Sequence, residues 1–593
     1  MYILGINAFH GDASAALLKD GELVCALEEE RLNRVKHCAG FPSLAIAACL
    51  REAGIGAGDL DHVAIGRDPS ANLMSKILFT LLRRPDVDQL IRGRMQNAAK
   101  VRDVMGFVAT ALNVPLSGLR AKVHNVEHHR AHLASTFFAS GFEDAALLTL
   151  DGMGDFVSTM RAVGHGTRFQ VLDQVEFPHS LGFLYTAVTQ WLGFPRYGDE
   201  GKVMGLAPYG RAVHLEKLLN VLHLKDDGLF ELNLDYFRHH AEGVAMNWEE
   251  GSPTLGRVYS DKLCELLGPA REPGSALTSY HEDIAASLQA ALEEGYWHLL
   301  AGLHAKTGLD RLCLAGGVAL NSVANGKILR RSPFKDVFVQ PAAGDNGTSL
   351  GAALYVWHQE LGKPRGYVMD HAHVGLGFDR DACESAATAA GLIYTVPGDE
   401  DALCAETAHA IADGQVIGWF QGRMEFGPRA LGARSIVADP RRAEMKDILN
   451  VRIKHREAFR PFAPSILVEA TGAWFTETHP SPCMLMVYPV RPEKRKQVPA
   501  ITHVDGSGRL QTVDRRTHPR YWKLIKAFET RTGVPMVLNT SFNENEPIVC
   551  TPADAVACFV KTNMDLLVLG DLVIRRADQP GARPLAGGGH ALA

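Results

Sequence analysis

The sequence predicts an α/β protein with two domains, and three of its features lead to that prediction. The chain of 593 residues is longer than the roughly 250–300 residues at which a single hydrophobic core stops growing. A glycine- and aspartate-bearing hairpin near the N-terminus is repeated near residue 150. Beyond residue 380, helical patterns alternate with short apolar strands, which is typical of a separate α/β domain.

The first domain is predicted to contain two related halves. Apolar segments at 2–7, 14–18 and 22–27 are separated by turn signals at 10–12 and 19–21, which predicts a three-stranded β-meander. The same order recurs where the apolar segment 145–150 runs into the loop 151–155 and is followed by the segment 157–163. Two such hairpins indicate a duplicated architecture.

Apolar spacing and turn residues predict the remaining elements. In the first domain, an Arg-rich helical stretch at 73–104 is followed by a helix that begins near Glu127 and by a helix at 276–306, which leads into a strand at 312–314. Another helix opens at 345–348. We expect a first domain over 1–362, a linker over 363–380 and a second domain over 381–576. In the second domain we expect a helix at 402–412 and strands at 416–420, 536–538 and 566–569. The Gly-, Ala- and Pro-rich tail, 577–593, is expected to fray.

Composition excludes several classes of function. With 46% hydrophobic and 22% charged residues, the chain resembles an ordinary globular protein. A net charge of -6 offers no basic surface for nucleic acid. No apolar run reaches the roughly 18 residues of a membrane span, and the first residues do not form a secretory signal. Ten cysteines without a C-x-x-C pair fit a reducing compartment. We therefore expect a cytoplasmic protein that binds neither membrane nor nucleic acid.

Two histidines suggest a metal site. His128 and His132 are four residues apart, so on a helix their imidazoles lie on one face, one turn apart. Asp151 and Asp345 stand at a strand end and a helix start beside glycines, where loop carboxylates converge. Two imidazoles and two carboxylates suit a divalent metal such as iron(II), zinc or manganese, and the ligand set does not choose among them. His129 points about 100° away on the helix.

Glycine-bearing turns suggest a nucleotide site. Gly316 and Gly317 stand between a strand and a helix, where backbone can approach a ligand closely, and Asn321 and Asn325 follow with amides that could hold a purine or ribose. The hairpin loops 10–14 and 151–155, the second with Gly152 and Gly154, could offer backbone N–H groups to phosphate. The alternative is that both loops are ordinary hairpins.

Basic residues of the second domain suggest an anion pocket. Guanidinium groups match phosphate and carboxylate oxygens in pairs, and the Gly, Pro and Phe neighbours of these residues imply partly buried loops. An ion-pair network between the domains is the alternative. The candidates are Arg429, Arg434, Lys454, Arg456, Arg460, Arg509, Asn539 and Ser541.

Ordered motifs over nearly the whole chain resemble one family. They are GINAFHGDASAAL, EEERLNRVKHCAGFP, EHHRAHLAS, LTLDGMGD, GKVMGLAPYG, LAGGVALNSVANG, GDNGTSLGAA, FGPRALGARSI, IKHREAFRPFAP, HVDGSGR and LNTSFNENEPIV. On these motifs the chain is identified as resembling the NodU/CmcH-type O-carbamoyltransferases.

The resemblance implies an N-terminal domain of the actin-like ATPase (ASKHA) superfamily, similar to TsaD, and a YrdC-like C-terminal domain. It places the family's iron(II) ligands on His128, His132, Asp151 and Asp345, and its catalytic histidine on His10. A nucleotide or carbamoyl-adenylate site in the N-terminal domain is expected at Lys36, Gly152, Gly154, Gly316, Gly317, Asn321 and Asn346. A site for carbamoyl phosphate and ATP with Mg²⁺ is expected in the C-terminal domain at Arg429, Lys454, Arg460, Arg509, Asn539 and Ser541.

The implied reaction forms carbamoyl-adenylate from carbamoyl phosphate and ATP, and then transfers the carbamoyl group to a hydroxyl of a small-molecule natural product, as in antibiotic biosynthesis. His10 is expected to be the general base, since imidazole titrates near neutrality. The Arg-rich segment 73–104 matches no motif and is expected to shape the acceptor pocket. Rival interpretations are an actin-like ATPase or sugar kinase, and threonylcarbamoyl transfer to tRNA. A symmetric homodimer is the default assembly.

Overall fold

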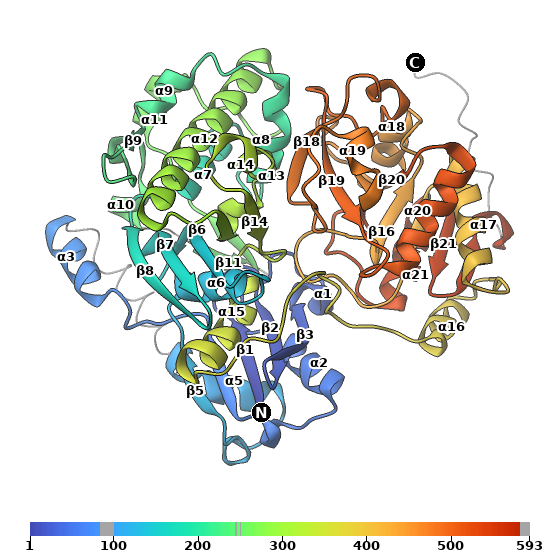
Figure 1. Cartoon of the computed structure of the whole chain (residues 1–593), viewed down its shortest axis with the longest axis horizontal. Coiled ribbons are helices and arrows are strands. Elements are labelled where there is room, and N and C mark those ends of the chain that lie inside the picture. The colour runs from blue at the N-terminus through green and yellow to red at the C-terminus, as the bar shows by residue number, and fades with distance from the viewer. Residues whose placement is uncertain (84–99, 244–245, 250, 581–593) are drawn as a thin grey trace. The chain divides into compact units, whose positions relative to one another are not determined.

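The computed structural model describes residues 1–83, 100–243, 246–249 and 251–580. The chain forms two compact units, Met1–Asp370 and His371–Ala593 (Figure 1). Both mix helices and strands, which confirms the α/β class. The middle of the Arg-rich stretch and most of the predicted frayed tail lie outside the described residues. Within the described ranges, no helix is both long and apolar enough to cross a membrane.

The first unit contains two five-stranded sheets with the same topology. Their orders are β3-β2-β1-β4-β5 and, in the matching direction, β8-β7-β6-β13-β14. In each sheet the first three strands along the chain are antiparallel, and the last two add in parallel. This repetition confirms the predicted duplication and is the actin-like arrangement. The strands are β1 Tyr2–Asn7, β2 Ser14–Lys19, β3 Glu22–Glu28, β4 His62–Ile65, β5 Lys122–Asn125, β6 Asp144–Gly154, β7 Val157–His165, β8 Arg168–Glu176, β13 Arg311–Ala315 and β14 Asp336–Val339.

Two equivalent helices meet at the centre of this unit. Helix α6, His128–Phe137, follows β5, and α15, Gly347–Tyr355, follows β14; α15 packs against both α6 and β1. The approach is close enough that a Cβ on Gly351 would lie 1.8 Å from the carbonyl oxygen of Ala131. Because α6 is buried along nearly its whole length, its position and direction are fixed by packing on several sides.

The first unit contains further helices, some of which the sequence predicted. The predicted helix 276–306 is observed as α12, Ser279–Thr307. The Arg-rich stretch includes α3, Leu73–Arg83, and leads to α5, Val104–Ala111. Strand β6 extends to Gly154, past the end predicted at residue 150, because Gly154 pairs with Val157 across the hairpin. Further helices are α1 Glu30–Asn33, α2 Ser43–Ala53, α7 Leu181–Trp191, α8 Glu200–Leu206, α9 Leu215–Leu219, α10 His239–Glu242, α11 Asp261–Leu267, α13 Ser322–Asn325 and α14 Ile328–Arg331.

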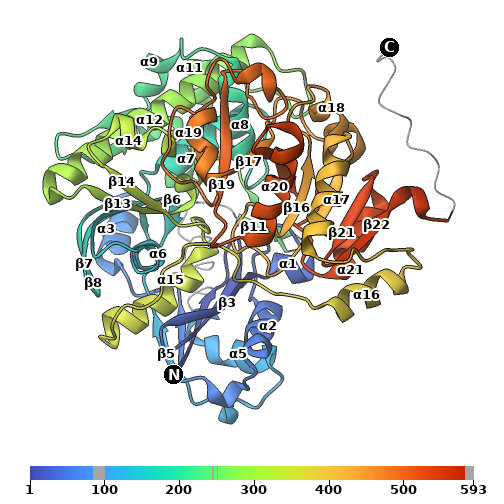
Figure 2. The same cartoon turned by 45° about the vertical axis from the view of Figure 1, so that its right-hand side comes forward.

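The second unit is built on one eight-stranded mixed sheet with the order β18-β19-β17-β20-β16-β15-β21-β22. Helices α17, Glu400–Ala412, and α20, Pro519–Thr532, lie side by side on it (Figure 2), and α16, Arg380–Ala389, packs with α21, Pro552–Lys561. The strands are β15 Ile417–Phe420, β16 Arg434–Ala438, β17 Ala463–Leu467, β18 Met486–Pro489, β19 Ser507–Val513, β20 Met536–Ser541, β21 Leu566–Leu569 and β22 Leu572–Arg575, and the remaining helices are α18 Met445–Leu449 and α19 Thr471–Trp474.

Candidate active site

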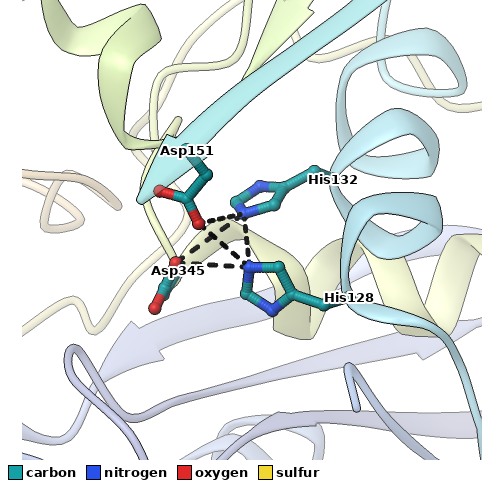
Figure 3. A group of neighbouring side chains, drawn as sticks. All are labelled: His128, His132, Asp151 and Asp345. Carbon is teal, nitrogen blue, oxygen red and sulfur yellow. Dashed lines mark hydrogen bonds and ion pairs between the residues drawn. The ribbon is translucent and has the colours of Figure 1, made fainter. Parts of the chain in front are cut away.

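Three elements of the first unit bring the predicted metal ligands together. His128 and His132 project from one face of α6, Asp151 lies in β6, and Asp345 lies just before α15 (Figure 3). Helix α6 begins at His128 because the carboxylate of Glu127 caps it, accepting a hydrogen bond from the backbone N–H of Arg130 at 2.8 Å. Since α6 and α15 are equivalent helices of the duplicated fold, their N-terminal ends meet at one point.

The spacing of these four side chains fits one metal ion. His128 Nε2 lies 3.1 Å from His132 Nε2 and 3.1 Å from Asp151 Oδ2, and 3.6 Å from Asp345 Oδ1. His132 Nε2 is 3.7 Å from each of the same two carboxylate oxygens. A tetrahedron with metal–ligand bonds of about 2.1 Å has edges of about 3.4 Å, so the observed distances are those of a ligand cage. The group could hold a metal ion.

Charge at this cluster is arranged for a cation. Burial alone lowers the pKa of His128, but the hydrogen bond with Asp151 and the charge of Asp345 together raise it to about 9. Burial likewise opposes ionisation of Asp151, and its hydrogen bonds with His128 and His132 hold its pKa well below the usual range. Burial and the charge of Asp151 raise the pKa of Asp345, but hydrogen bonds with His10 and His132 lower it overall. Both carboxylates are therefore ionised near neutrality, and a metal ion bound here would displace the proton of His128.

Three of the predicted glycines support the candidate metal ligands. A Cβ on Gly154 would lie 2.0 Å from Cδ2 of the His128 ring, so only glycine leaves room for that imidazole. The backbone N–H of Gly317 donates to Asp151 Oδ1 at 3.1 Å and fixes the carboxylate. Gly316, with φ of 93°, makes the turn that places it. These glycines act on the metal ligands, a role that the nucleotide interpretation did not include.

His10 contacts the same cluster. Its Nδ1 lies 2.9 Å from Asp345 Oδ2, and its ring centroid lies 5.5 Å from that of His128. Because the Asp345 carboxylate accepts, the proton is assigned to Nδ1, which leaves Nε2 as the basic atom. Burial lowers the pKa of His10, against the hydrogen bond and charge of Asp345. His10 is therefore neutral near pH 7, as a general base must be.

The remaining residues of the predicted nucleotide site differ in how accessible they are to a ligand. No heavy atom lies within 4 Å of a Cβ placed on Gly152, so this backbone faces open space, and Lys36 is exposed in the loop after α1. The Asn346 amide donates to Glu28 Oε1 at 2.9 Å.

Asn321 and Asn325 make internal hydrogen bonds that the sequence did not predict. Asn321 Oδ1 caps α13 by accepting from the Ala324 N–H at 3.0 Å. Asn325 Nδ2 donates to the Ala319 carbonyl at 2.7 Å. Since the amides are committed to internal contacts, we do not include Asn321 in the proposed site.

Close to His10 in the sequence, Asp12 belongs to a second set of interacting side chains that sequence patterns did not identify. His37 Nδ1 lies 2.8 Å from Asp12 Oδ1, and the His37 backbone N–H donates to Glu30 Oε2 at 2.6 Å. The Tyr197 ring lies 5.3 Å from that of His37, and burial together with the charges of Asp12 and the metal-site carboxylates raises the pKa of Tyr197 well above its usual range. Asp12 and His37 have positive φ values of 58° and 55°, a conformation that is uncommon outside glycine but not visible in sequence.

The second unit brings four arginines to one place. The positive charges of Arg429, Arg456 and Arg460, after burial, lower the pKa of Arg509 well below its ordinary value. Burial and Arg460 lower the pKa of Arg429 to about 10. Glu457 lies 3.7 Å from Arg460 and forms an ion pair with it. The predicted anion pocket is thus a cluster with excess positive charge.

Polar residues of β20 hold the loops of this cluster. Asn539 Nδ2 donates to the Ala430 carbonyl at 3.1 Å, next to Arg429. Lys454 Nζ donates to the Ser541 carbonyl at 2.6 Å and to Asn543 Oδ1 at 2.7 Å, and burial lowers the pKa of Lys454 well below its ordinary value.

Arg434 does not belong to the anion pocket, which corrects the prediction from sequence. It is fully buried and donates to the carbonyls of Gln421 at 2.8 Å and Cys550 at 3.2 Å. Its guanidinium also lies 3.7 Å over the ring of Phe420. A guanidinium occupied by backbone carbonyls and a ring is a structural element.

Two family models match this chain, one in each half. The family model described as the carbamoyltransferase N-terminus matches residues 2–354, and that described as the carbamoyltransferase C-terminus matches residues 408–576. The chain belongs to the carbamoyltransferase family. It is therefore a transferase, and the two matched regions contain the four candidate metal ligands and the arginine cluster respectively.

Relatives in this family cover most of the chain. Nodulation protein NolNO of Sinorhizobium fredii is 42% identical over 96% of this chain and 80% of its own. Protein sll1178 of Synechocystis sp., of unassigned function, is 42% identical over 98% of this chain and 97% of its own. Nodulation protein U of Rhizobium tropici is 29% identical over 92% of this chain and 91% of its own.

Proposed function

We propose that this carbamoyltransferase uses ATP and carbamoyl phosphate to make carbamoyl-adenylate, and transfers the carbamoyl group to a hydroxyl of a small-molecule natural product. The observation that carries the proposal is the arginine cluster of the second unit, where burial and neighbouring arginines lower the pKa of Arg509. Such a site is stabilised by anions, and both substrates carry phosphate.

In the first step, water cleaves the acyl phosphate (mixed anhydride) linkage of carbamoyl phosphate, which releases inorganic phosphate and carbamate. A carbamate oxygen then bonds to the α-phosphorus of ATP, and pyrophosphate leaves. The arginines are suited to both events because each displaces a phosphate-bearing group whose charge they neutralise.

The second step is assigned to the first unit. The acceptor hydroxyl loses its proton to Nε2 of His10 and its oxygen bonds to the carbamoyl carbon, while AMP leaves. Asp345 holds the His10 ring through Nδ1, so Nε2 stays available for the proton. A divalent ion held by the four ligands would act as a Lewis acid toward an oxygen of the activated carbamoyl group. We assign iron(II) from the family resemblance, since zinc and manganese fit the same ligands.

Product analysis separates this proposal from its rivals. With carbamoyl phosphate and ATP but no acceptor, we expect AMP, pyrophosphate and phosphate in amounts that depend on carbamoyl phosphate. ADP formation at a rate that does not depend on carbamoyl phosphate would instead identify an actin-like ATPase or sugar kinase. Arg509→Met should abolish AMP formation. Arg441→Met is the matched control, because Arg441 is ion-paired with Asp439 at 2.7 Å. Retention of tRNA in a filter-binding assay would favour threonylcarbamoyl transfer.

A further inference from the structure

The arginine cluster contains a member outside the six residues that the family resemblance assigns to the pocket. Arg456 lies in the loop between the π-helical turn Asn450–Lys454 and strand β17. Its guanidinium lies 4.5 Å over the ring of Phe462, which directly precedes β17. Ala463 of β17 pairs with Asn539 of β20, and β17 also pairs with the Arg509 strand β19. Packing thus places Arg456 at the same end of the sheet as the assigned residues.

Three arginines of this cluster carry buried donors that the protein does not satisfy. Within the described ranges, the Nε atoms of Arg429, Arg456 and Arg509 are buried without a hydrogen-bond partner. A buried donor without an acceptor costs free energy, and such donors are rare in folded proteins. The side chains themselves remain partly exposed, so a ligand can reach them from solvent.

Two other buried arginines, Arg161 and Arg434, do have hydrogen-bond acceptors within the protein. Arg161 forms a fork with the Asp173 carboxylate at 2.6 and 2.8 Å and donates to the Gly228 carbonyl at 3.0 Å. Arg434 is likewise surrounded by carbonyl oxygens. At Arg161 and Arg434, the fold itself supplies the acceptors. The cluster lacks them, which indicates that its acceptors come from a ligand.

The charge of the cluster sets the amount of ligand it can take. Four guanidinium groups and the ammonium group of Lys454, whose charged neighbours include Arg456 and Arg460, lie with the ion-paired carboxylate of Glu457, which leaves an excess of at most about four positive charges. One phosphate group carries about -1.5 to -2 near neutral pH, so it leaves the cluster positive. Two phosphate groups bring it close to neutral.

On the basis of the function proposed above, we infer that Arg456 is a further phosphate-binding residue, and that the pocket holds two phosphate groups at the same time. Arg429, Arg460 and Arg509 suffice for the first group. Arg456 serves the second, and its stacking on Phe462 orients the guanidinium fork toward it.

Calorimetric titration of the full-length protein with inorganic phosphate and with pyrophosphate, without ATP, tests the inference. Arg456→Met keeps the apolar stem against Phe462 and removes the charge. We expect it to weaken pyrophosphate binding roughly tenfold to a hundredfold, as for loss of a charge-assisted hydrogen bond, and phosphate binding less than about threefold. Arg456→Lys keeps the positive charge but lacks the planar guanidinium group. Its affinity for pyrophosphate should lie between those of the unaltered protein and Arg456→Met. Arg452→Met is the matched control one turn earlier, because Arg452 is ion-paired with Asp565 at 3.4 Å.

The possible outcomes separate the inference from the function on which it depends. Unchanged pyrophosphate binding in Arg456→Met would show that Arg456 is no ligand. An equal loss with both probes would overturn the arrangement of two phosphate groups. If the unaltered protein bound neither probe, the anion pocket of the proposed function would itself be wrong. Melting of the ligand-free variants gives an independent readout: an unsatisfied arginine should leave stability unchanged or raised when removed, whereas a structural one should lower it.

Discussion

Replacement of Gly154 by alanine should destroy the metal site without touching a ligand. The added Cβ would lie 2.0 Å from Cδ2 and 2.1 Å from Cγ of the His128 ring. Carbon atoms in contact are about 3.5 Å apart, so the ring and the strand end must separate by about 1.5 Å. Metal–ligand distances tolerate changes of about 0.2 Å. His128 therefore cannot remain a ligand, and the loss should exceed the roughly 10–100-fold caused by removing an outer-sphere partner.

The assay is the metal content per chain after dialysis against a defined low concentration of free metal, with thermal melting as a check on folding. Gly152→Ala is the matched control, two residues earlier, because no heavy atom lies within 4 Å of its Cβ. We expect full metal content in Gly152→Ala and an empty site in a folded Gly154→Ala protein. Equal metal content in both variants would refute the ligand geometry.

The remaining predictions concern His10 and the carboxylate that holds it. His10→Asn should abolish carbamoyl transfer while AMP formation from ATP and carbamoyl phosphate continues and metal content stays unchanged; transfer at the full rate would make the base assignment wrong. Burial lowers the pKa of His10 below its ordinary 6.5 and the neutral ring is the base, so the midpoint of the acidic decline in the pH–rate profile of transfer should lie below pH 6.5; a midpoint above 6.5 would contradict this. Asp345→Asn removes a metal ligand together with the partner of His10, so elemental analysis should show loss of metal and transfer should cease; retained metal would exclude Asp345 as a ligand.

Local periodicity was enough to predict much of the candidate metal site. The spacing of His128 and His132 specifies one face of a helix whatever the rest of the chain does. Asp151 and Asp345 follow from their places at a strand end and a helix start, because equivalent elements of a duplicated fold converge at one point. The two meanders could be predicted for the same reason, since their turns are encoded by adjacent residues.

Contacts between residues far apart in the sequence determine the roles of several side chains that local patterns could not predict. Arg434 and Arg456 look alike in sequence, but one meets the Cys550 carbonyl far along the chain and the other meets no acceptor among the described residues. Asn321 is committed to Gln289, Nδ2 to Oε1 at 2.9 Å, a partner that no spacing rule supplies. The steric role of Gly154 is equally hidden, because it depends on where α6 places the His128 ring.

Both candidate sites hold like charges together in the ligand-free chain, and their signs are opposite. In the first unit burial and the charge of Asp151 oppose ionisation of Asp345, although hydrogen bonds with His10 and His132 lower its pKa overall, and in the second burial and the charges of Arg429, Arg456 and Arg460 lower the pKa of Arg509. Such crowding costs free energy, while Arg161 shows that the chain compensates buried charge where stability requires it. This unfavourable free energy is found at the two places where a cation and phosphates are proposed to bind. Neutral substitutions at Arg509 should therefore lower ligand affinity without lowering ligand-free stability, the reverse of a substitution at Arg161.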